Sequence, residues 1–283
     1  MKIVITGGTG LVGRYLSICF KSDEVVVLSR KDCDITVFES VRKLFYRIMP
    51  DVVVHLAAFT DVDLSEKDPV SAFKVNVSGT NNVALVCKKI DAYIVYVSTD
   101  FVFDGKKKMP YSEKDIPEPI SIYGKTKFEG ERVIANNCKK YCIVRTSRVF
   151  GRDGNNFASN LPKRLLQRER MYVTTDLITS PTYAKDLAEG LLRIMEARFC
   201  GILHFSNSGH CSWYDFASCV CRYLGLKKDL LVPLSIKDFP QSIAERPPFS
   251  ALDTSFFTEN FYRPRSWQQA LEEYLEEEFS QKI

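Results

Sequence analysis

The feature that most constrains the fold of this chain is a glycine-rich turn close to its first residue. Residues 6–13 read TGGTGLVG and lie between a short apolar run, Lys2–Thr6, and a helical pattern, Leu11–Phe20. Glycines at this spacing allow a tight turn and a close approach of the backbone to a pyrophosphate, which the N–H groups at the helix start would bind. Because the turn follows a strand and opens a helix, it predicts a dinucleotide site.

Apolar runs alternate with helical patterns throughout the first half of the chain. The expected strands are Lys2–Thr6, Val25–Leu28, Asp51–Leu56, Tyr93–Val97 and Tyr141–Arg145. The expected helices are Leu11–Phe20, Val37–Ile48, Pro69–Lys89 and Tyr123–Asn136. Continuous β-branched strands are typical of a sheet covered on both faces. The order therefore predicts an α/β, Rossmann-like, doubly wound parallel sheet.

The second half of the chain is less regular and predicts a smaller C-terminal substrate-binding lobe. Its helical patterns cover Asn156–Arg170, Tyr183–Ala197, Trp213–Leu224 and Trp267–Glu278, and its strand candidates are Met171–Thr174 and Gly201–Phe205. We place a boundary near Phe150, between an NAD(P)-binding Rossmann domain (1–150) and the lobe (151–283). Residues 180–205 are candidates to return to the first layer, so the two parts are expected to interleave.

Charge and cysteine usage exclude several classes of protein. The 283 residues carry a formal net charge of only +4, which does not predict a nucleic-acid or membrane partner. No run approaches the roughly 20 apolar residues of a membrane span, and the N-terminal apolar run is too short for a signal peptide. The nine cysteines are then expected to be reduced in a cytoplasm. Three distant histidines give no metal constellation.

The end of the second strand bears on the choice of cofactor. An NAD site usually has an acidic residue there for the ribose 2′-hydroxyl, whereas this chain has Arg30, which favours a 2′-phosphate. NADPH is therefore the predicted cofactor. NADH stays open as the alternative, because Arg30 could equally be a surface arginine. Asp34 and Ile35, a few residues on, are candidates to face the adenine.

A tyrosine and a lysine one helical turn apart form the candidate catalytic pair. Tyr123 and Lys127 stand at i and i+4, so both side chains share one helix face. A neighbouring ammonium would favour the phenolate and lower the tyrosine pKa, which makes Tyr123 a proton donor or acceptor near neutral pH. Ser98-Thr99-Asp100 ends the fourth strand, where a hydroxyl could bond the same substrate oxygen.

Together these motifs resemble the extended short-chain dehydrogenase/reductase superfamily and, within it, the dTDP-4-dehydrorhamnose reductase family. The resemblance covers nearly the whole chain and is most specific in residues 99–105 (TDFVFDG) and 180–184 (SPTYA). The other matching segments are 57–60 (AAFT), 75–76 (VN), 123–127 (YGKTK), 151–157 (GRDGNNF), 186–187 (DL), 246–247 (RP) and 252–255 (LDTS).

The resemblance implies hydride transfer from a reduced nicotinamide to the C4 ketone of a dTDP-4-keto-6-deoxyhexose, giving dTDP-rhamnose for cell-surface polysaccharide. Tyr123 would donate the proton, and Lys127 would hold the nicotinamide ribose and lower the Tyr123 pKa. Thr99 would bond the ketone oxygen, and Asp100 would contact the substrate. The implied cofactor contacts are Gly7, Gly10, Leu11, Val12, Gly13, Arg30, Asp34, Ile35, Ala57, Ala58, Thr60, Asn76, Tyr123 and Lys127. The implied substrate contacts are Thr99, Asp100, Phe101, Asn155, Asn156, Ser180 and Arg246.

The partner implied is a dTDP-sugar, and a homodimer is left open because the superfamily often dimerises. Mg²⁺ assists some family members, but the sequence offers no acidic cluster to which it could be assigned. Two positions depart from the family pattern: Arg148 stands where the family often has Trp, and Glu245 where it often has Arg. The first departure leaves the sugar uncertain, and the second could weaken a diphosphate contact.

Three other functions share part of this sequence pattern. A 4,6-dehydratase needs a carboxylic acid directly after the Thr-Asp pair, where this chain has Phe101, whose ring cannot protonate a leaving hydroxyl. A C4 epimerase shares the Tyr and Lys but fits the later segments less well. A regulatory subunit like the β subunit of methionine adenosyltransferase has a similar fold, and retention of Thr99, Tyr123 and Lys127 argues against that role.

Overall fold

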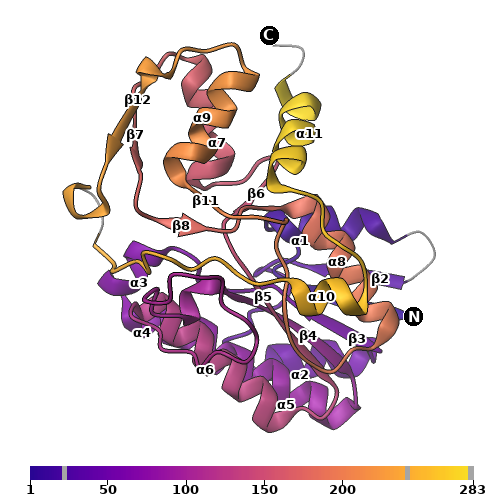
Figure 1. Ribbon diagram of the computed structural model, residues 1–283. Coiled ribbons are helices and arrows are strands. Elements are labelled where there is room, and N and C mark those ends of the chain that lie inside the picture. Colours follow the sequence, from indigo (N-terminus) through magenta and orange to yellow (C-terminus); the bar gives the residue numbers. More distant parts are fainter. Residues whose placement is uncertain (21–23, 240–242, 280–283) are drawn as a thin grey trace.

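A six-stranded parallel sheet forms the base of the molecule (Figure 1). The computed structural model describes residues 1–20, 24–239 and 243–279. The strands of this sheet are β1 (Lys2–Thr6), β2 (Glu24–Leu28), β3 (Val52–His55), β4 (Tyr93–Thr99), β5 (Tyr141–Thr146) and β10 (Gly201–His204). Their order is β10-β5-β4-β3-β1-β2, and every neighbouring pair is parallel.

Helices cover both faces of the sheet, so the predicted doubly wound fold is confirmed. The helices in question are α1 (Leu11–Cys19), α2 (Phe38–Ile48), α5 (Thr80–Ile90), α6 (Ile122–Asn137) and α8 (Ala184–Ala197). Leu16 of α1 and Leu191 of α8 share one apolar cluster with Ile3 and Val54 of the sheet. The opposite face packs on α2, α5 and α6, as Figure 1 shows below the strands. All four residues of β3 are buried, which explains its continuous apolar sequence.

The strand order changes direction between β1 and β3, and this point positions the site. The chain runs outward from β1 to β2, then returns to place β3 on the other side of β1. In open α/β sheets ligands bind at such a switch point, outside the carboxyl ends of the strands. The glycine turn follows β1, and Ala57 follows β3, so both segments border this crevice.

A second lobe lies above the carboxyl ends of the strands (Figure 1). Its helices are α7 (Phe157–Leu166), α9 (Trp213–Tyr223) and α11 (Trp267–Phe279), which share one core. Three two-stranded ribbons complete it: β6 (Val149–Phe150) with β9 (Thr182–Tyr183), β7 (Met171–Thr174) with β12 (Leu231–Leu234), and β8 (Ile178–Thr179) with β11 (Cys211–Ser212). Short α10 (Ser255–Asn260) packs by β10. Between the lobe's segments the chain returns to the sheet as α8 and β10, while the boundary near residue 150 stays a prediction.

One predicted helix is interrupted by wider turns. The pattern over Pro69–Lys89 predicts a single helix, but the structure has α4 (Pro69–Phe73), a π-helical segment (Lys74–Gly79) and then α5. Asn76 lies buried in the π-helical segment, and its amide bonds a neighbouring loop. Such bulges often occur at functional sites, and sequence periodicity does not reveal them. Short α3 (Val62–Lys67) also lacked a periodic signal.

Among the residues that the structure describes, no helix is both long and apolar enough to cross a bilayer.

Candidate active site

The glycine turn packs tightly against the loop that follows β3. Gly7 adopts a left-handed φ of +65°, and a Cβ built on it would lie 2.6 Å from the Ala57 backbone nitrogen. A Cβ on Gly13 would lie 2.3 Å from the Gly8 carbonyl oxygen. No side chain caps the first turn of α1, so its N–H groups remain available for a phosphate. These positions therefore require glycine for physical reasons and fit a dinucleotide pyrophosphate.

The predicted cofactor residues after β2 lie beside this turn. The Gly8 N–H donates to the Leu28 carbonyl at 3.0 Å, which joins the turn to the end of β2. Arg30 is exposed and lies 3.6 Å from the Asp34 carboxylate. Asp34 accepts bonds from the backbone N–H and hydroxyl of Thr36, and these hydrogen bonds lower its pKa. The Arg30 guanidinium is therefore exposed just beyond the end of β2, in a long ion pair with Asp34.

Asn76 holds together the loop that contains Ala57, Ala58 and Thr60. Its side-chain oxygen accepts from the Phe59 N–H at 2.7 Å, and its amide donates to the Phe59 carbonyl and to the Thr126 hydroxyl, each at 3.0 Å. The buried amide therefore joins the β3 loop to α6. A direct contact of Asn76 with the cofactor stays a prediction.

The catalytic candidates Tyr123 and Thr99 meet at the carboxyl end of β4. Ser121 caps α6 by accepting from the Gly124 N–H at 3.1 Å, which sets Tyr123 in the first turn. A Cβ on Gly124 would lie 2.2 Å from the Phe101 carbonyl oxygen, so glycine lets the helix start approach the turn after β4. The Thr99 side chain lies close enough to the Tyr123 phenol to oppose the rise of its pKa, so the two hydroxyl groups lie near each other at this end of the strand.

The expected effect of Lys127 on the acidity of Tyr123 is wrong for this arrangement. Burial raises the pKa of Tyr123 to about 12, which outweighs the opposing effect of Thr99. The Lys127 ammonium instead donates to the Val97 carbonyl at 2.8 Å and lies 4.0 Å from the centre of the Tyr96 ring. Burial lowers the pKa of Lys127 to about 7, against the opposing charge of Glu131. Desolvation therefore dominates both groups.

Asp100, predicted to be catalytic and to contact the substrate, is enclosed by three hydroxyl groups. Ser147 and Ser250 donate to one carboxylate oxygen at 2.8 and 2.5 Å, and Thr99 donates to the other at 3.1 Å. The side chain is fully buried, and burial raises its pKa. This geometry favours a role in orienting the Thr99 hydroxyl, while direct substrate contact stays a prediction.

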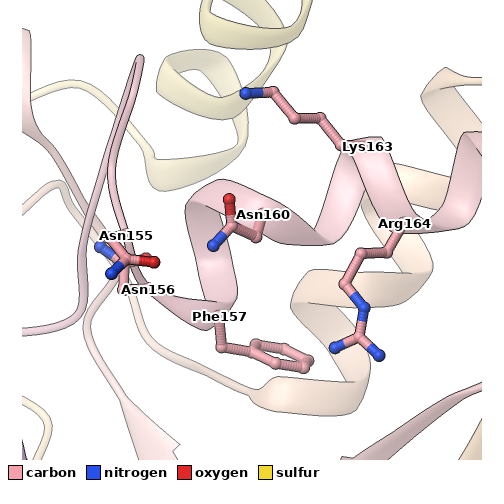
Figure 2. A pocket seen from close by; sticks show the side chains of 6 residues that line it. All are labelled: Asn155, Asn156, Phe157, Asn160, Lys163 and Arg164. Carbon is pink, nitrogen blue, oxygen red and sulfur yellow. The ribbon is translucent and has the colours of Figure 1, made fainter.

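A pocket of about 420 Å³ at the start of α7 contains two of the predicted substrate residues. Figure 2 shows its lining: Asn155, Asn156, Phe157, Asn160, Lys163 and Arg164. Asn156 also caps α7 by accepting from the Ser159 N–H. Sequence reasoning missed the last four residues, although Asn156, Asn160, Lys163 and Arg164 share a helical spacing. Amides and two cations suit an anionic, hydrogen-bonding ligand.

The other predicted substrate residues are held by protein contacts. Ser180 is buried and accepts from the Leu252 N–H at 3.1 Å. Arg246 forms a two-point ion pair with Asp63 of α3, with nitrogen–oxygen distances of 2.7 and 3.2 Å. Phe101 lies edge-on to Tyr123, with ring centres 5.6 Å apart. Of these, Phe101 is the one that the structure brings to the Tyr123 ring.

Arg148, the departure from the family pattern, stacks on an indole from the second lobe. Its guanidinium carbon lies 3.8 Å from the centre of the Trp213 ring, and it donates to the Ser212 carbonyl at 3.3 Å. Burial lowers its pKa to about 10. Trp213 itself lies edge-on to Phe157 of the α7 pocket, with their ring centres 4.8 Å apart. An arginine–aromatic stack therefore connects the strand end after β5 with the pocket.

Within residues 1–20, 24–239 and 243–279, no group of three or more His, Cys, Asp or Glu side chains lies close enough to hold a metal ion. This part of the chain therefore offers no ligand set to which Mg²⁺ can be assigned.

Comparison with known proteins gives consistent findings. The family model described as RmlD substrate binding domain matches residues 1–280. The spore coat polysaccharide biosynthesis protein SpsK of Bacillus subtilis is 40% identical over 99% of this chain and 98% of its own length. The dTDP-4-dehydrorhamnose reductase of Aggregatibacter actinomycetemcomitans is 36% identical over 95% of this chain and 97% of its own.

Solved structures agree with these sequence matches. The dTDP-4-dehydrorhamnose reductase of Bacillus anthracis, solved in complex with NADP, has a TM-score of 0.94 and 34% identity, covering 98% of this chain and 99% of its own. The UDP-glucose 4-epimerase of Thermus thermophilus reaches a TM-score of 0.85 at 19% identity, covering 100% of both chains, and so shares the fold alone.

Proposed function

Since the chain belongs to the RmlD substrate binding domain family, we infer that it reduces the C4 ketone of dTDP-4-dehydrorhamnose with NADPH. The product is dTDP-L-rhamnose, a nucleotide sugar used for cell-surface polysaccharide. The observation that carries this inference is the placement of Tyr123 beside Thr99 at the carboxyl end of β4, with Lys127 on the same helix as Tyr123.

The residues present fit the cofactor. The glycine turn before α1 would hold the pyrophosphate against the uncapped N–H groups at the helix start, and Gly7 and Gly13 keep this turn tight because a Cβ there would collide with backbone atoms. NADPH supplies the hydride when bound. Lys127 would hold the nicotinamide ribose, and Arg30 would pair with the 2′-phosphate.

The chain's own residues would supply the proton and the orientation. Thr99 and Tyr123 would both bond the C4 oxygen, and Asp100 would orient the Thr99 hydroxyl. As the hydride reaches C4, the carbonyl oxygen takes up the electron pair and accepts the phenolic proton of Tyr123. A pKa of about 12 keeps that phenol protonated at neutral pH, so the acid is present when the substrate binds.

A direct assay tests this function. Loss of NADPH absorbance is followed with a panel of 4-keto nucleotide sugars, and NMR assigns the stereochemistry of each product. We expect rapid oxidation with dTDP-4-dehydrorhamnose and formation of the L-rhamnose isomer. Absence of NADPH oxidation with every 4-keto sugar would overturn the proposal, as would production of a 4-keto-6-deoxy sugar from dTDP-glucose.

Arg30 gives a prediction about cofactor choice. Replacing it by alanine should lower the preference for NADPH over NADH by about ten-fold in kcat/KM, because a charge-assisted phosphate contact is worth about 1.4 kcal/mol or more. Steady-state kinetics with both cofactors measure this ratio. Lys31→Ala, an exposed neighbouring cation, is the control, and an equal effect in both variants would contradict the assignment.

Lys163 gives a prediction about the nucleotide end of the substrate. Arg164 is already paired with Glu169 at 2.6 Å, so the exposed Lys163 is the better candidate to meet a diphosphate. Lys163→Ala should raise KM for the dTDP-sugar about ten-fold and leave kcat nearly unchanged. Competition by dTDP provides a second readout. Lys139→Ala, two residues beyond the end of α6, serves as the control; a KM that stays at the wild-type value in both would remove Lys163 from the pocket's function.

We also propose that the enzyme works in the cytoplasm, which is supported by its nine cysteines, all of them free thiols.

Light scattering of the purified protein measures its mass and so tests whether it forms a homodimer.

A further inference from the structure

A buried carboxylate lies one helical turn beyond Lys127. Tyr123, Lys127 and Glu131 occupy i, i+4 and i+8 of α6, so one helix face presents all three to the sheet. Lys127 and Glu131 are each only 3% exposed. The reaction described above uses the first two side chains and leaves Glu131 without a role.

Glu131 binds a matched pair of residues on two neighbouring strands. Its Oε1 accepts from the Ser98 hydroxyl at 2.5 Å and from Arg145 Nε at 3.0 Å, and its Oε2 accepts from Arg145 Nη2 at 2.7 Å. Ser98 and Arg145 face each other in the register of β4 and β5. One carboxylate therefore ties the helix to both strands at a single rung of the sheet.

That rung lies directly below the reacting groups. Thr99 follows Ser98, and the Val97 carbonyl that receives the Lys127 ammonium precedes it. A shift of β4 against α6 would move the Thr99 hydroxyl and the acceptor of Lys127 together. Such a site loses rate steeply when its groups move by about 1 Å.

We propose that Glu131 is a positioning residue of the reductase, which fixes β4 and β5 against α6 and so holds Thr99 and Lys127 in their reactive geometry. The proposal rests on the reductase function inferred above. The buried Glu131–Arg145 pair then positions reactive groups in addition to stabilising the fold.

The charge of Glu131 adds an electrostatic consequence. The titratable and charged groups around Lys127 are His55 on β3, Tyr96 on β4, Tyr123 and Glu131 on α6, and Arg145 on β5 behind Glu131. Burial lowers the pKa of His55 to about 3, so this ring is neutral at physiological pH. Glu131 opposes the loss of the Lys127 proton that burial favours.

The decisive experiment compares Glu131→Gln with Glu129→Gln in the full-length enzyme. Glu129 lies two residues away on α6 but pairs with Arg132 at the surface, so its loss controls for the substitution itself. We expect Glu131→Gln to lower kcat/KM by about ten-fold or more. The alkaline limb of its pH profile should move to lower pH by about one unit, because Lys127 loses its proton more readily without the carboxylate.

Ser98→Ala keeps the Glu131–Arg145 ion pair and removes only the hydrogen bond between Glu131 and β4. It therefore tests positioning separately from charge. This variant should fold, lose kcat and keep the wild-type pH profile. NADPH binding, followed by fluorescence at pH values on both sides of 7, is a readout independent of turnover. If Glu131→Gln does not fold, Ser98→Ala decides the question.

Three results would overturn the inference. In the first, Glu131→Gln has the same kcat/KM and the same pH profile as Glu129→Gln after both activities are normalised to the amount of folded protein. In the second, Glu131→Gln loses activity only in proportion to unfolded protein, which is a structural role alone. In the third, Ser98→Ala turns over like the wild type. Wild-type reduction of the 4-keto sugar, measured alongside, separates each of these results from a failure of the proposed function.

Discussion

Tyr123→Phe should lower kcat by about 10²–10⁴-fold while NADPH still binds with nearly wild-type affinity. The substitution removes one oxygen and leaves the ring that packs edge-on against Phe101, so the fold of the site should persist. Without the phenol, the alkoxide that would develop at C4 would keep the Thr99 hydroxyl as a partner but lose the proposed acid. Rapid-mixing measurement of NADPH oxidation would separate this chemical step from binding.

Tyr172→Phe is the matched control, because that phenol lies on β7 with 54% of the residue exposed. It should retain full activity. Turnover by Tyr123→Phe within a few-fold of this control would contradict the assignment of Tyr123 as the acid and would leave Thr99 or a water molecule as the donor.

Lys127→Met should lower kcat/KM by about 10²–10³-fold and weaken NADPH binding. Methionine fills much of the buried space of the lysine stem but supplies no ammonium for the ribose. The same charge predicts a pH dependence in the wild type. Lys127 is a cation below its pKa of about 7 and neutral above it, so NADPH should bind more tightly on the acid side of pH 7.

This dependence should vanish in Lys127→Met and persist in Lys125→Met, whose side chain is exposed on the same helix. Titrations of NADPH fluorescence at several pH values measure it. A pH dependence that survives in Lys127→Met would mean that another group titrates, and the role of Lys127 would then be steric.

The sequence predicts the sheet well because burial on both faces leaves a strong signature. Continuous runs such as Val52–His55 can hardly be anything but covered strands, and glycines between a strand and a helix have few alternative uses. That Tyr123 and Lys127 share one helix face follows from helix geometry alone. Weakly patterned parts, such as β8 and β11 with two residues each, give no comparable signal.

Contacts between distant residues could not be predicted in this way. Ser250 reaches Asp100 from 150 positions away, and Trp213 reaches Arg148 from the second lobe. The direction in which the Tyr123 pKa shifts could not be predicted either. Residue spacing reveals that Lys127 is near but not how strongly burial acts on Tyr123 and Lys127. Desolvation is a property of the assembled site.

The chain returns from the second lobe to the six-stranded sheet, and this return limits how such an enzyme can diversify. Leaving β9, the chain contributes α8 and β10 to the layers of the six-stranded sheet before it re-enters the second lobe at β11. Recombination between relatives at one junction near residue 150 would therefore exchange an edge strand and a covering helix as well as the pocket. We expect new sugar preferences to arise more readily from point changes where the second lobe meets the strand ends, such as at Arg148, than from shuffling whole halves.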